Sequence, residues 1–133
     1  MQKVVVGIIS RTKQNNEVEY LLVSSKKDVG EFTGFYYPPG GQIEVGEDEQ
    51  TALIRELKEE LDLDIKPTAR ITATAGDVAD SVVYWWECEI VGDDTIEIKD
   101  SNIANAGYFT RNDMDDMKIW PATRKFFDEF IWR

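Results

Sequence analysis

The chain has 133 residues, of which 42% are hydrophobic, and it carries 26 acidic against 15 basic side chains. This length fits a single domain, which we place over residues 1–133. The formal net charge of −11 argues against a protein that binds duplex nucleic acid, which needs a basic surface to displace counterions. The sequence contains no histidine, which excludes Ser-His-Asp and Cys-His nucleophilic schemes and zinc sites built on imidazole.

The single cysteine, Cys88, cannot form an internal disulfide, so nothing calls for an oxidising compartment. Cys88 lies in an apolar run, and we interpret it as a small core residue. The apolar N-terminal run is too short to cross a membrane and is followed at once by basic residues. We therefore expect a cytoplasmic protein with no membrane partner.

The first part of the chain predicts a β-hairpin followed by an aromatic loop. A mostly β-branched run over residues 4–10 and a returning strand over 18–25 flank a turn at 12–17 that contains two asparagines. Aromatic residues then lead into Pro38-Pro39 and Gly40-Gly41. Proline favours extended or turn backbone here, and glycine permits conformations closed to other residues.

A helix is expected from Asp48 to Leu63, and three glutamates on it carry the main functional signal. Each helical residue advances by about 100°, so Glu56, Glu59 and Glu60 fall within an arc of roughly 100°. Like charges at these spacings destabilise an isolated helix by roughly a few tenths of a kcal/mol per pair. Mg²⁺ or Mn²⁺ offsets this repulsion, because a hard divalent cation prefers carboxylate and phosphate oxygens. A solvated acidic face is the alternative interpretation.

The second part of the chain predicts a further strand pair, a short last strand and a closing helix. In the strand over 82–91 the even-numbered residues are all apolar, so we expect them to face the core and Trp85 to project from the other side. The full set of expected elements is a strand at 68–75, a turn at 76–80, the strand at 82–91, a polar loop or edge segment at 96–105, a strand at 107–110 and an amphipathic helix at 121–132.

The stretch from Gly41 to Leu63 resembles the signature of the Nudix hydrolases, G-x5-E-x7-R-E-U-x-E-E-x-G-U with U aliphatic. Asp62 stands where that family has glycine, and we expect it to adopt the left-handed conformation at the helix end at modest cost. The residues that match in register are Gly41, Glu47, Arg55, Glu56, Leu57, Glu59, Glu60 and Leu63.

The resemblance implies an α+β fold, a mixed-sheet α/β/α sandwich in which the signature forms a loop, a helix and a loop. It implies hydrolysis of a nucleoside diphosphate linked to another group, by attack of water on phosphorus with Mg²⁺ or Mn²⁺ as cofactor. A plain helix salt bridge is the alternative role for Arg55. The implied roles are metal ligation by Glu59, Glu60 and the Gly40 carbonyl, metal ligation or general-base catalysis by Glu56, and orientation of Glu47 by Arg55.

The family often takes a further acidic metal ligand from the loop before the last strand. In this chain Asn102 and Asn105 stand where a glutamate is expected, and Asp100 is the nearest carboxylate. Either Asp100 supplies that ligand, or the ligand is missing and metal binding is weaker.

Aromatic and basic side chains outside the signature are the candidates for substrate binding. Stacking of an aromatic ring on a base contributes about 1–3 kcal/mol, and Trp85 is favoured because it lies off the apolar face. Core packing or plain surface charge is the alternative for each candidate. The candidates are Phe35, Tyr36, Tyr37 and Trp85 for the base, and Arg11, Lys26 and Lys27 for the phosphates.

The short chain most resembles the MutT-like members, which cleave (d)NTPs, sometimes oxidised ones, to the monophosphate and pyrophosphate. The proline that marks the ADP-ribose type is absent around residues 78–80, and the arginine of the coenzyme A type is absent near Lys26. ADP-ribose, nucleotide-sugar or dinucleoside polyphosphate hydrolysis and a non-catalytic nucleotide sensor remain the alternatives. Phe130 and Trp132 fit the core or a subunit contact, which leaves a monomer or a homodimer open.

Overall fold

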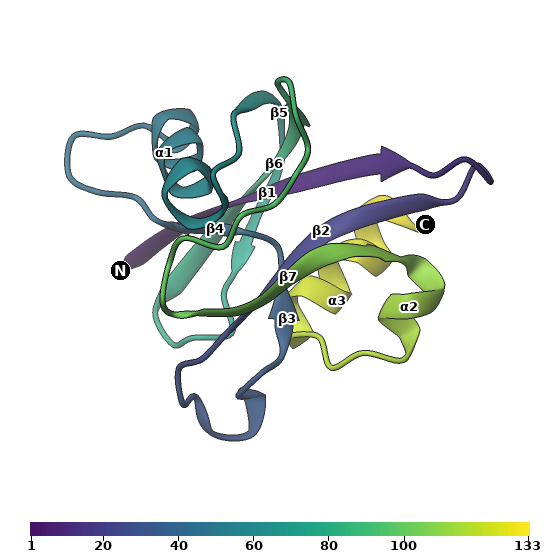
Figure 1. The fold of residues 1–133 in the computed structure, drawn as a ribbon. Helices are drawn as coiled ribbons and strands as arrows, with labels where there is room; N and C mark the ends of the chain where they lie inside the picture. The colour runs from purple at the N-terminus through teal and green to yellow at the C-terminus, as the bar shows by residue number, and fades with distance from the viewer.

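The computed structural model describes residues 1–133 and places a seven-stranded mixed sheet between helices (Figure 1). In chain order the strands are β1 (Gln2–Thr12), β2 (Val18–Ser25), β3 (Tyr36–Tyr37), β4 (Gly40–Gln42), β5 (Ile65–Ala75), β6 (Ser81–Ile90) and β7 (Ile103–Thr110). The helices are α1 (Glu49–Leu61), α2 (Arg111–Asp115) and α3 (Pro121–Phe126), with a 3₁₀ turn at Gly30–Phe32 and a π-helical turn at Phe127–Ile131.

The long strand β1 holds the sheet together, because it pairs with three other strands. Its first part runs parallel to β6, with Gln2 opposite Ser81, and antiparallel to β4, with Val6 opposite Gly40. Its last part forms the predicted hairpin with β2, with Ser10 opposite Tyr20. β5 completes one edge beyond β6, and β7 pairs with β2 on the other side of the molecule.

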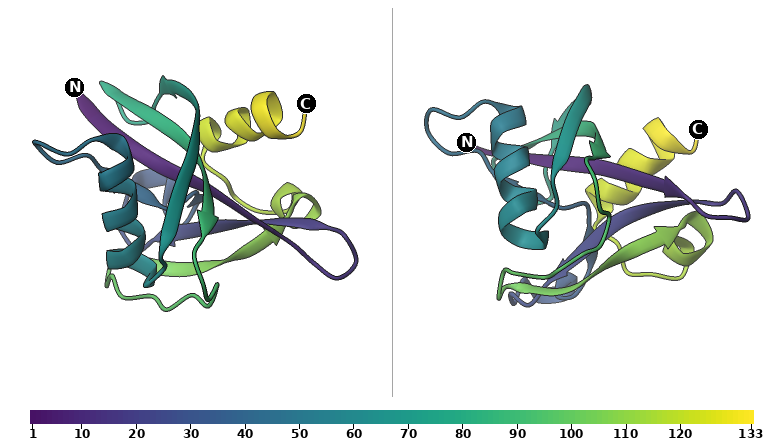
Figure 2. Two further views of the ribbon diagram at one scale, coloured as in Figure 1. Left: turned by 90° about the horizontal axis from the view of Figure 1, so that it is seen from above. Right: turned by 45° about the horizontal axis from the view of Figure 1, so that its top comes forward.

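Helices cover both faces of the strands around β1. Figure 2 shows α1 on one side and the C-terminal helix on the other. Alternate residues of β1 therefore enter two different cores: Val5 and Ile9 pack with α1, whereas Val6 and Ile8 pack toward the C-terminal helix. This arrangement confirms the predicted α+β class and its α/β/α layering.

The prediction that Trp85 projects away from the core is wrong. Trp85 is 2% exposed and stacks on Phe126, with ring centroids 4.1 Å apart and an interplanar angle of 3°. Its indole N–H donates to the Thr74 hydroxyl at 2.8 Å. The reason is that the second face of β6 is also buried, so the alternation in this strand separates one core from another.

Several element boundaries also differ from the predicted ones. β5 begins at Ile65 and β7 at Ile103, because pairing with β6 and β2 extends each strand beyond its apolar centre. α2 was not predicted, and a capping box between Thr110 and Asp113 begins it. The C-terminal helix changes to π-helical backbone at Phe127.

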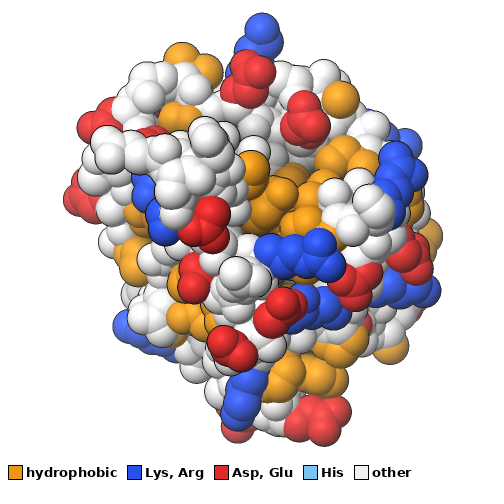
Figure 3. Space-filling view, turned by 90° about the vertical axis from the view of Figure 1, so that its right-hand side faces the viewer, with side chains coloured by type: hydrophobic (Ala, Val, Ile, Leu, Met, Phe, Trp, Pro, Cys, Tyr) orange, Lys and Arg blue, Asp and Glu red, His pale blue; other side chains and the backbone are white.

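Cys88 is buried in the core, as predicted, and burial raises the pKa of its thiol to about 12. No helix has the length and apolar character needed to cross a membrane. On the face shown in Figure 3, acidic and basic side chains are interspersed around a hydrophobic area, so the negative net charge is not gathered into one patch there.

Candidate active site

The site begins where the signature loop enters α1. Asp48 caps the helix by accepting from the Thr51 N–H at 2.7 Å, which satisfies one of the free donors of the first turn. Glu47 folds back to accept from the Glu44 N–H at 2.9 Å, and Gly46 supplies the positive φ of 87° in this turn. The loop is therefore fixed by its own side chains.

The other end of α1 shows the conformation expected for the departure from the family signature. Asp62 has φ 55° and ψ 38°, the left-handed region, and its N–H closes the helix on Leu57 and Lys58. Its carboxylate also lies 3.1 Å from the Lys58 ammonium group. Aspartate thus ends the helix as the family glycine does, and α1 keeps its position.

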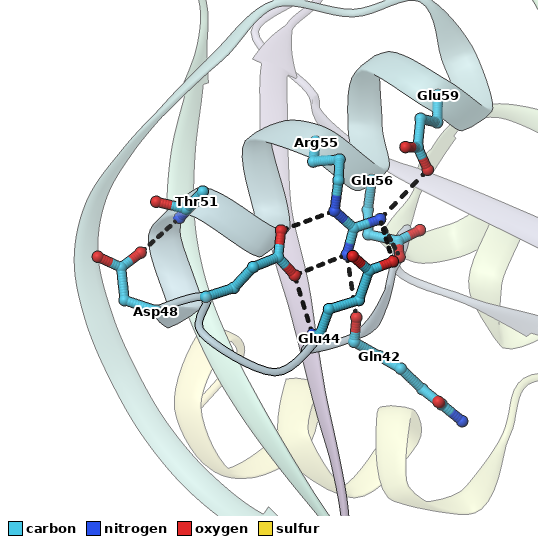
Figure 4. A network of polar contacts seen from close by, with 8 residues as sticks. Gln42, Glu44, Asp48, Thr51, Arg55, Glu56 and Glu59 are labelled. Atoms are coloured by element: carbon cyan, nitrogen blue, oxygen red, sulfur yellow. Dashed lines mark hydrogen bonds and ion pairs between the residues drawn. The ribbon is translucent and has the colours of Figure 1, made fainter.

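Arg55 is the centre of the polar network at the start of the site (Figure 4). Its guanidinium group donates to both carboxylate oxygens of Glu47, at 2.7 and 2.9 Å, and to the Gln42 carbonyl at 3.2 Å. It also contacts Glu56 at 3.0 Å and Glu59 at 3.2 Å. Arg55 therefore makes both the contact to Glu47 that the resemblance implies and the helix pair to Glu59 that was its alternative.

The pKa values within this network follow from these contacts. The fork from Arg55, together with the Glu44 N–H, lowers the pKa of Glu47 to about 2. Glu56 lies deeper, and burial raises the pKa of its carboxyl although Arg55 opposes the rise. Glu47 is thus a fixed anion that anchors the loop, whereas a further cation would stabilise the ionised form of Glu56.

Gly41 brings the backbone of β4 against the Glu56 carboxylate. A Cβ at Gly41 would overlap that carboxylate, and a Cβ at Gly40 would overlap the backbone of Val5. The two glycines therefore allow one strand to pass between β1 and the glutamates of α1. Any larger residue at these positions displaces Glu56 or opens the sheet.

Glu60 carries the only buried side-chain nitrogen or oxygen of the molecule that lacks a hydrogen-bond partner. Its side chain is buried, and its Oε2 atom has no hydrogen-bond partner. Burial, the neighbouring Glu56 and the more distant Asp100 raise its pKa to about 8, opposed by the Gly40 N–H. An unpartnered buried carboxylate oxygen beside a second carboxylate costs free energy unless a cation reaches it.

These residues fit a hard divalent cation. The donor set is made of carboxylate oxygens, the ligands that Mg²⁺ and Mn²⁺ prefer, and the orphaned oxygen of Glu60 lies within it. No three acidic side chains lie close enough together to hold a cation as they stand. The structure brings Glu56, Glu60 and Gly40 together, whereas Glu59 contacts Arg55 on the exposed side of the helix. Asp100 lies farther off and acts on Glu60 only through its charge.

A cavity of about 300 Å³ lies on the other face of the sheet. Its floor is formed by β1 and β6, and its aromatic wall by Phe32, Phe35 and Trp120. Phe32 stacks on Trp120 with ring centroids 4.8 Å apart and meets Phe35 edge-on at 5.2 Å. The lining is largely apolar, as in most small-molecule sites.

Tyr37 joins this cavity to the carboxylates. It lines the cavity, and burial, followed by the charges of Glu60 and Asp100, raises its pKa to about 12. Of the other predicted substrate residues, Trp85 lines the floor but its ring face is covered by Phe126, so it is not free to stack on a base.

Of the basic residues proposed for phosphate binding, Lys27 lines the cavity and Arg11 and Lys26 do not. Arg11 is held by Glu19 at 2.6 Å and Asp94 at 2.9 Å and lies over the Tyr108 ring at 3.6 Å. Two carboxylates and an aromatic ring contact the Arg11 guanidinium group, and its role in phosphate binding stays a prediction.

Two cavity residues were missed from the sequence. Trp120 directly precedes Pro121, the first residue of α3. The hydrogen bond from its N–H to the Tyr36 carbonyl, at 3.1 Å, brings it next to the aromatic loop before β3. Asp77 lies in an exposed turn with no signal of its own in the sequence. Both depend on contacts between segments far apart in the chain.

The chain belongs to the Nudix family, because the family model described as NUDIX domain matches residues 1–130. Members of this family act on the pyrophosphate bond of nucleoside diphosphate derivatives and generally use divalent metal ions. A search of curated proteins finds no match to the sequence.

Solved structures show the same fold at low sequence identity. A Caenorhabditis elegans Ap4A hydrolase has a TM-score of 0.77 and 20% identity, with 96% of each chain covered. A MutT NUDIX hydrolase from Burkholderia pseudomallei has a TM-score of 0.74 and 18% identity, covering 97% of this chain and 98% of the other. The NUDIX domain of Shewanella oneidensis NrtR, complexed with ADP ribose, has a TM-score of 0.75 and 16% identity, covering 95% and 83%.

Proposed function

We propose that this protein is a divalent-metal-dependent nucleotide pyrophosphohydrolase that cleaves a (d)NTP, or an oxidised (d)NTP, to the monophosphate and pyrophosphate. The observation that carries the proposal is Glu60, whose buried Oε2 atom has no partner and lies beside Glu56. A fold without metal chemistry gains nothing from such a pair, because each carboxylate raises the cost of ionising the other.

A bound Mg²⁺ or Mn²⁺ would neutralise phosphate charge and lower the pKa of a water molecule. Glu60, Glu56 and the Gly40 backbone are the groups that would hold it, with Asp100 as a further candidate from the loop before β7. Glu59 is exposed, and to join this metal site it would have to leave its 3.2 Å contact with Arg55. Glu56 or Glu59 is then placed to take the proton of the attacking water.

The cavity gives the substrate its orientation. A base held between the aromatic wall and the strands extends its phosphates past Tyr37 toward Glu60. Tyr37 lines the cavity, and its neutral hydroxyl is a hydrogen-bond donor for a phosphate oxygen. This path fits a compact nucleotide, which supports a (d)NTP over the larger alternatives.

The proposal is tested with a panel of nucleotides in the presence of millimolar Mg²⁺, at neutral and alkaline pH, with identification of the products. The panel contains the (d)NTPs, oxidised (d)NTPs, ADP-ribose, a nucleotide sugar and a dinucleoside polyphosphate. We expect a monophosphate and pyrophosphate from at least one (d)NTP. Binding without turnover across the whole panel would identify a nucleotide sensor and overturn the proposal.

The site assignment is tested by Glu59→Gln and Glu60→Gln, each of which should lower kcat by orders of magnitude while the fold is kept. Glu97→Gln is the matched control, because Glu97 is exposed in the segment between β6 and β7 and meets the end of α1 only through its backbone N–H to the Leu61 carbonyl. Turnover that survives both substitutions would show that the metal assignment is wrong.

Tyr37→Phe removes only the hydroxyl group at the passage. We expect it to raise KM more than Tyr36→Phe, whose ring packs edge-on against Phe109 in the other core. Equal KM values for the two variants would remove Tyr37 from the substrate path.

A further inference from the structure

Residues 91–102 cross from β6 to β7 without forming a helix or strand, and most of them are exposed. The crossing passes the end of α1, where the Lys99 N–H donates to the Glu60 carbonyl at 2.8 Å. The Glu97 N–H donates to the Leu61 carbonyl at 3.1 Å. These carbonyls belong to the last turn of α1, which offers them no partner of its own. The 91–102 segment therefore completes the end of the helix that carries Glu60.

Asp100 takes its place from this segment. It directly follows Lys99, and its carboxylate accepts from the Asn102 N–H at 2.8 Å. Its charge acts on Glu60, so the carboxylate lies within electrostatic range of the candidate metal ligands. Because Lys99 and Asp100 are adjacent, any movement of the segment along α1 moves this carboxylate as well.

Arg11 and Tyr108 hold the same segment at Asp94. The Arg11 Nη1 atom donates to the Asp94 carboxylate at 2.9 Å, and the Tyr108 hydroxyl donates to the Asp94 carbonyl at 3.0 Å. The guanidinium group lies 3.6 Å above the centre of the Tyr108 ring, an arrangement in which cation and ring attract each other. Asp94 is thus bound through both its side chain and its backbone, and we call this arrangement of three residues the Asp94 clamp.

The clamp is anchored in the sheet. Arg11 is opposite Glu19 in the hairpin of β1 and β2, and its Nε atom donates to the Glu19 carboxylate at 2.6 Å. Glu19 is only 9% exposed, and Tyr108 is fixed by pairing with Leu21 of β2. The guanidinium group uses separate nitrogens for its two carboxylates, which fixes its plane. This pairing favours a positioning role for Arg11 over contact with phosphates.

We propose that the Asp94 clamp positions Asp100 for the metal site, which makes Arg11 and Tyr108 positioning residues, an inference that rests on the proposed function. Ordering a segment without secondary structure costs conformational entropy for every residue. Without the clamp, the metal would have to order the 91–102 segment as it binds. A clamp that forms before the metal arrives removes this cost and so tightens metal binding.

The test compares Mn²⁺ binding to Asp94→Ala and Glu97→Ala, measured by electron paramagnetic resonance without nucleotide. Each variant removes one negative charge from the segment, and Glu97 lies closer in sequence to Asp100 while being outside the clamp. Asp94→Ala should raise the Kd about 3–10-fold, less than the about 10–100-fold typical for groups that contact a metal ligand. Glu97→Ala should stay within about 2-fold. An equal or larger effect in Glu97→Ala would overturn the inference, because charge and not position would then account for the change.

A double substitution shows whether the clamp acts through Asp100. In an Asp100→Asn background, Asp94→Ala should change the Kd by less than about 2-fold, since effects that share one route do not add. Full additivity of the two substitutions would overturn the inference. Tyr108→Phe removes only the hydroxyl donor and should raise the Kd about 2–3-fold in the wild-type background. Asp94→Ala leaves the buried pair of Arg11 and Glu19 intact, so the variant keeps its fold.

Hydrogen exchange in metal-free buffer supplies a readout that needs neither metal nor turnover. The Lys99 amide should exchange at least about 5-fold faster in Asp94→Ala than in the wild type, and at the wild-type rate in Glu97→Ala. Unchanged Lys99 exchange in Asp94→Ala would overturn the clamp even if nucleotides are hydrolysed. Faster exchange together with weaker Mn²⁺ binding supports it even if no nucleotide is hydrolysed, so the two proposals fail separately.

Discussion

Glu60→Gln should make the metal-free protein more stable while removing its activity. Folding raises the pKa of this carboxyl from an ordinary 4.5 to about 8, so between these pH values the folded chain holds a proton that the unfolded chain has lost. The free energy of unfolding therefore falls as pH rises through this window. At pH 7 the cost reaches roughly 3 kcal/mol, since each pH unit contributes about 1.36 kcal/mol.

Glutamine has the same shape and no charge, so this cost disappears in the variant. We expect the variant to lie within about 1 kcal/mol of the wild type near pH 5 and to exceed it by about 3 kcal/mol at pH 7, which is about 10 °C in melting temperature. The assay is urea unfolding followed by circular dichroism at several pH values with EDTA, and Glu97→Gln is the control.

Mg²⁺ should raise the melting temperature of the wild type more than that of Glu60→Gln, because the cation binds the folded carboxylates. A stability difference between variant and wild type that does not change from pH 5 to pH 8 would refute the burial argument. An equal Mg²⁺ shift in both proteins would refute the ligand assignment.

Three further substitutions test other parts of the structure. Glu47→Gln should lower activity. It should also make the free energy of unfolding depend less on pH between about pH 4.5 and 2, because the anion paired with Arg55 stabilises the fold above this window and is lost as pH falls through it. An unchanged pH dependence would contradict this. Asp62→Gly should leave stability equal or raise it by up to about 1 kcal/mol, since glycine relieves the left-handed backbone and only two surface ion pairs, with Lys58 and Lys99, are lost. A marked drop in the urea midpoint would show that these ion pairs contribute more. Trp85→Ala should lower the free energy of unfolding by about 3–5 kcal/mol because it removes a buried ring stacked on Phe126, and a loss below 1 kcal/mol in urea would disprove that packing.

The sequence was sufficient for the helix and its glutamates because the signal there is local. The spacing of Glu56 and Glu60 and the left-handed end at Asp62 depend only on helical geometry and on the next few residues. The same geometry offered the pair of Arg55 and Glu59 only as an alternative to the contact with Glu47. It could not show that Arg55 makes both contacts, because that depends on how the loop before the helix folds back.

The cavity could not be predicted in the same way. The alternation of apolar residues in β6 assigns side chains to its two faces, but it does not show that a second core covers the other face. Trp85 was therefore wrongly predicted to project away from the core. Phe35 was found because it lies in an aromatic run, whereas Trp120 and Asp77 were missed, since long-range pairing alone brings them to the cavity.

The parallel pairing of β1 with β6 has a consequence for how the protein is made. Gln2 meets Ser81 and Ile9 meets Cys88, so β1 leaves the ribosome well before β6 and finds this neighbour only after the intervening segment has followed. Closing such a long loop is slow compared with forming the hairpin of β1 and β2. The segment enclosed by that loop contains α1, so the glutamates gain their buried positions late in folding. Nascent chains that stall before Ile90 would therefore expose an apolar edge of β1 and depend on chaperones.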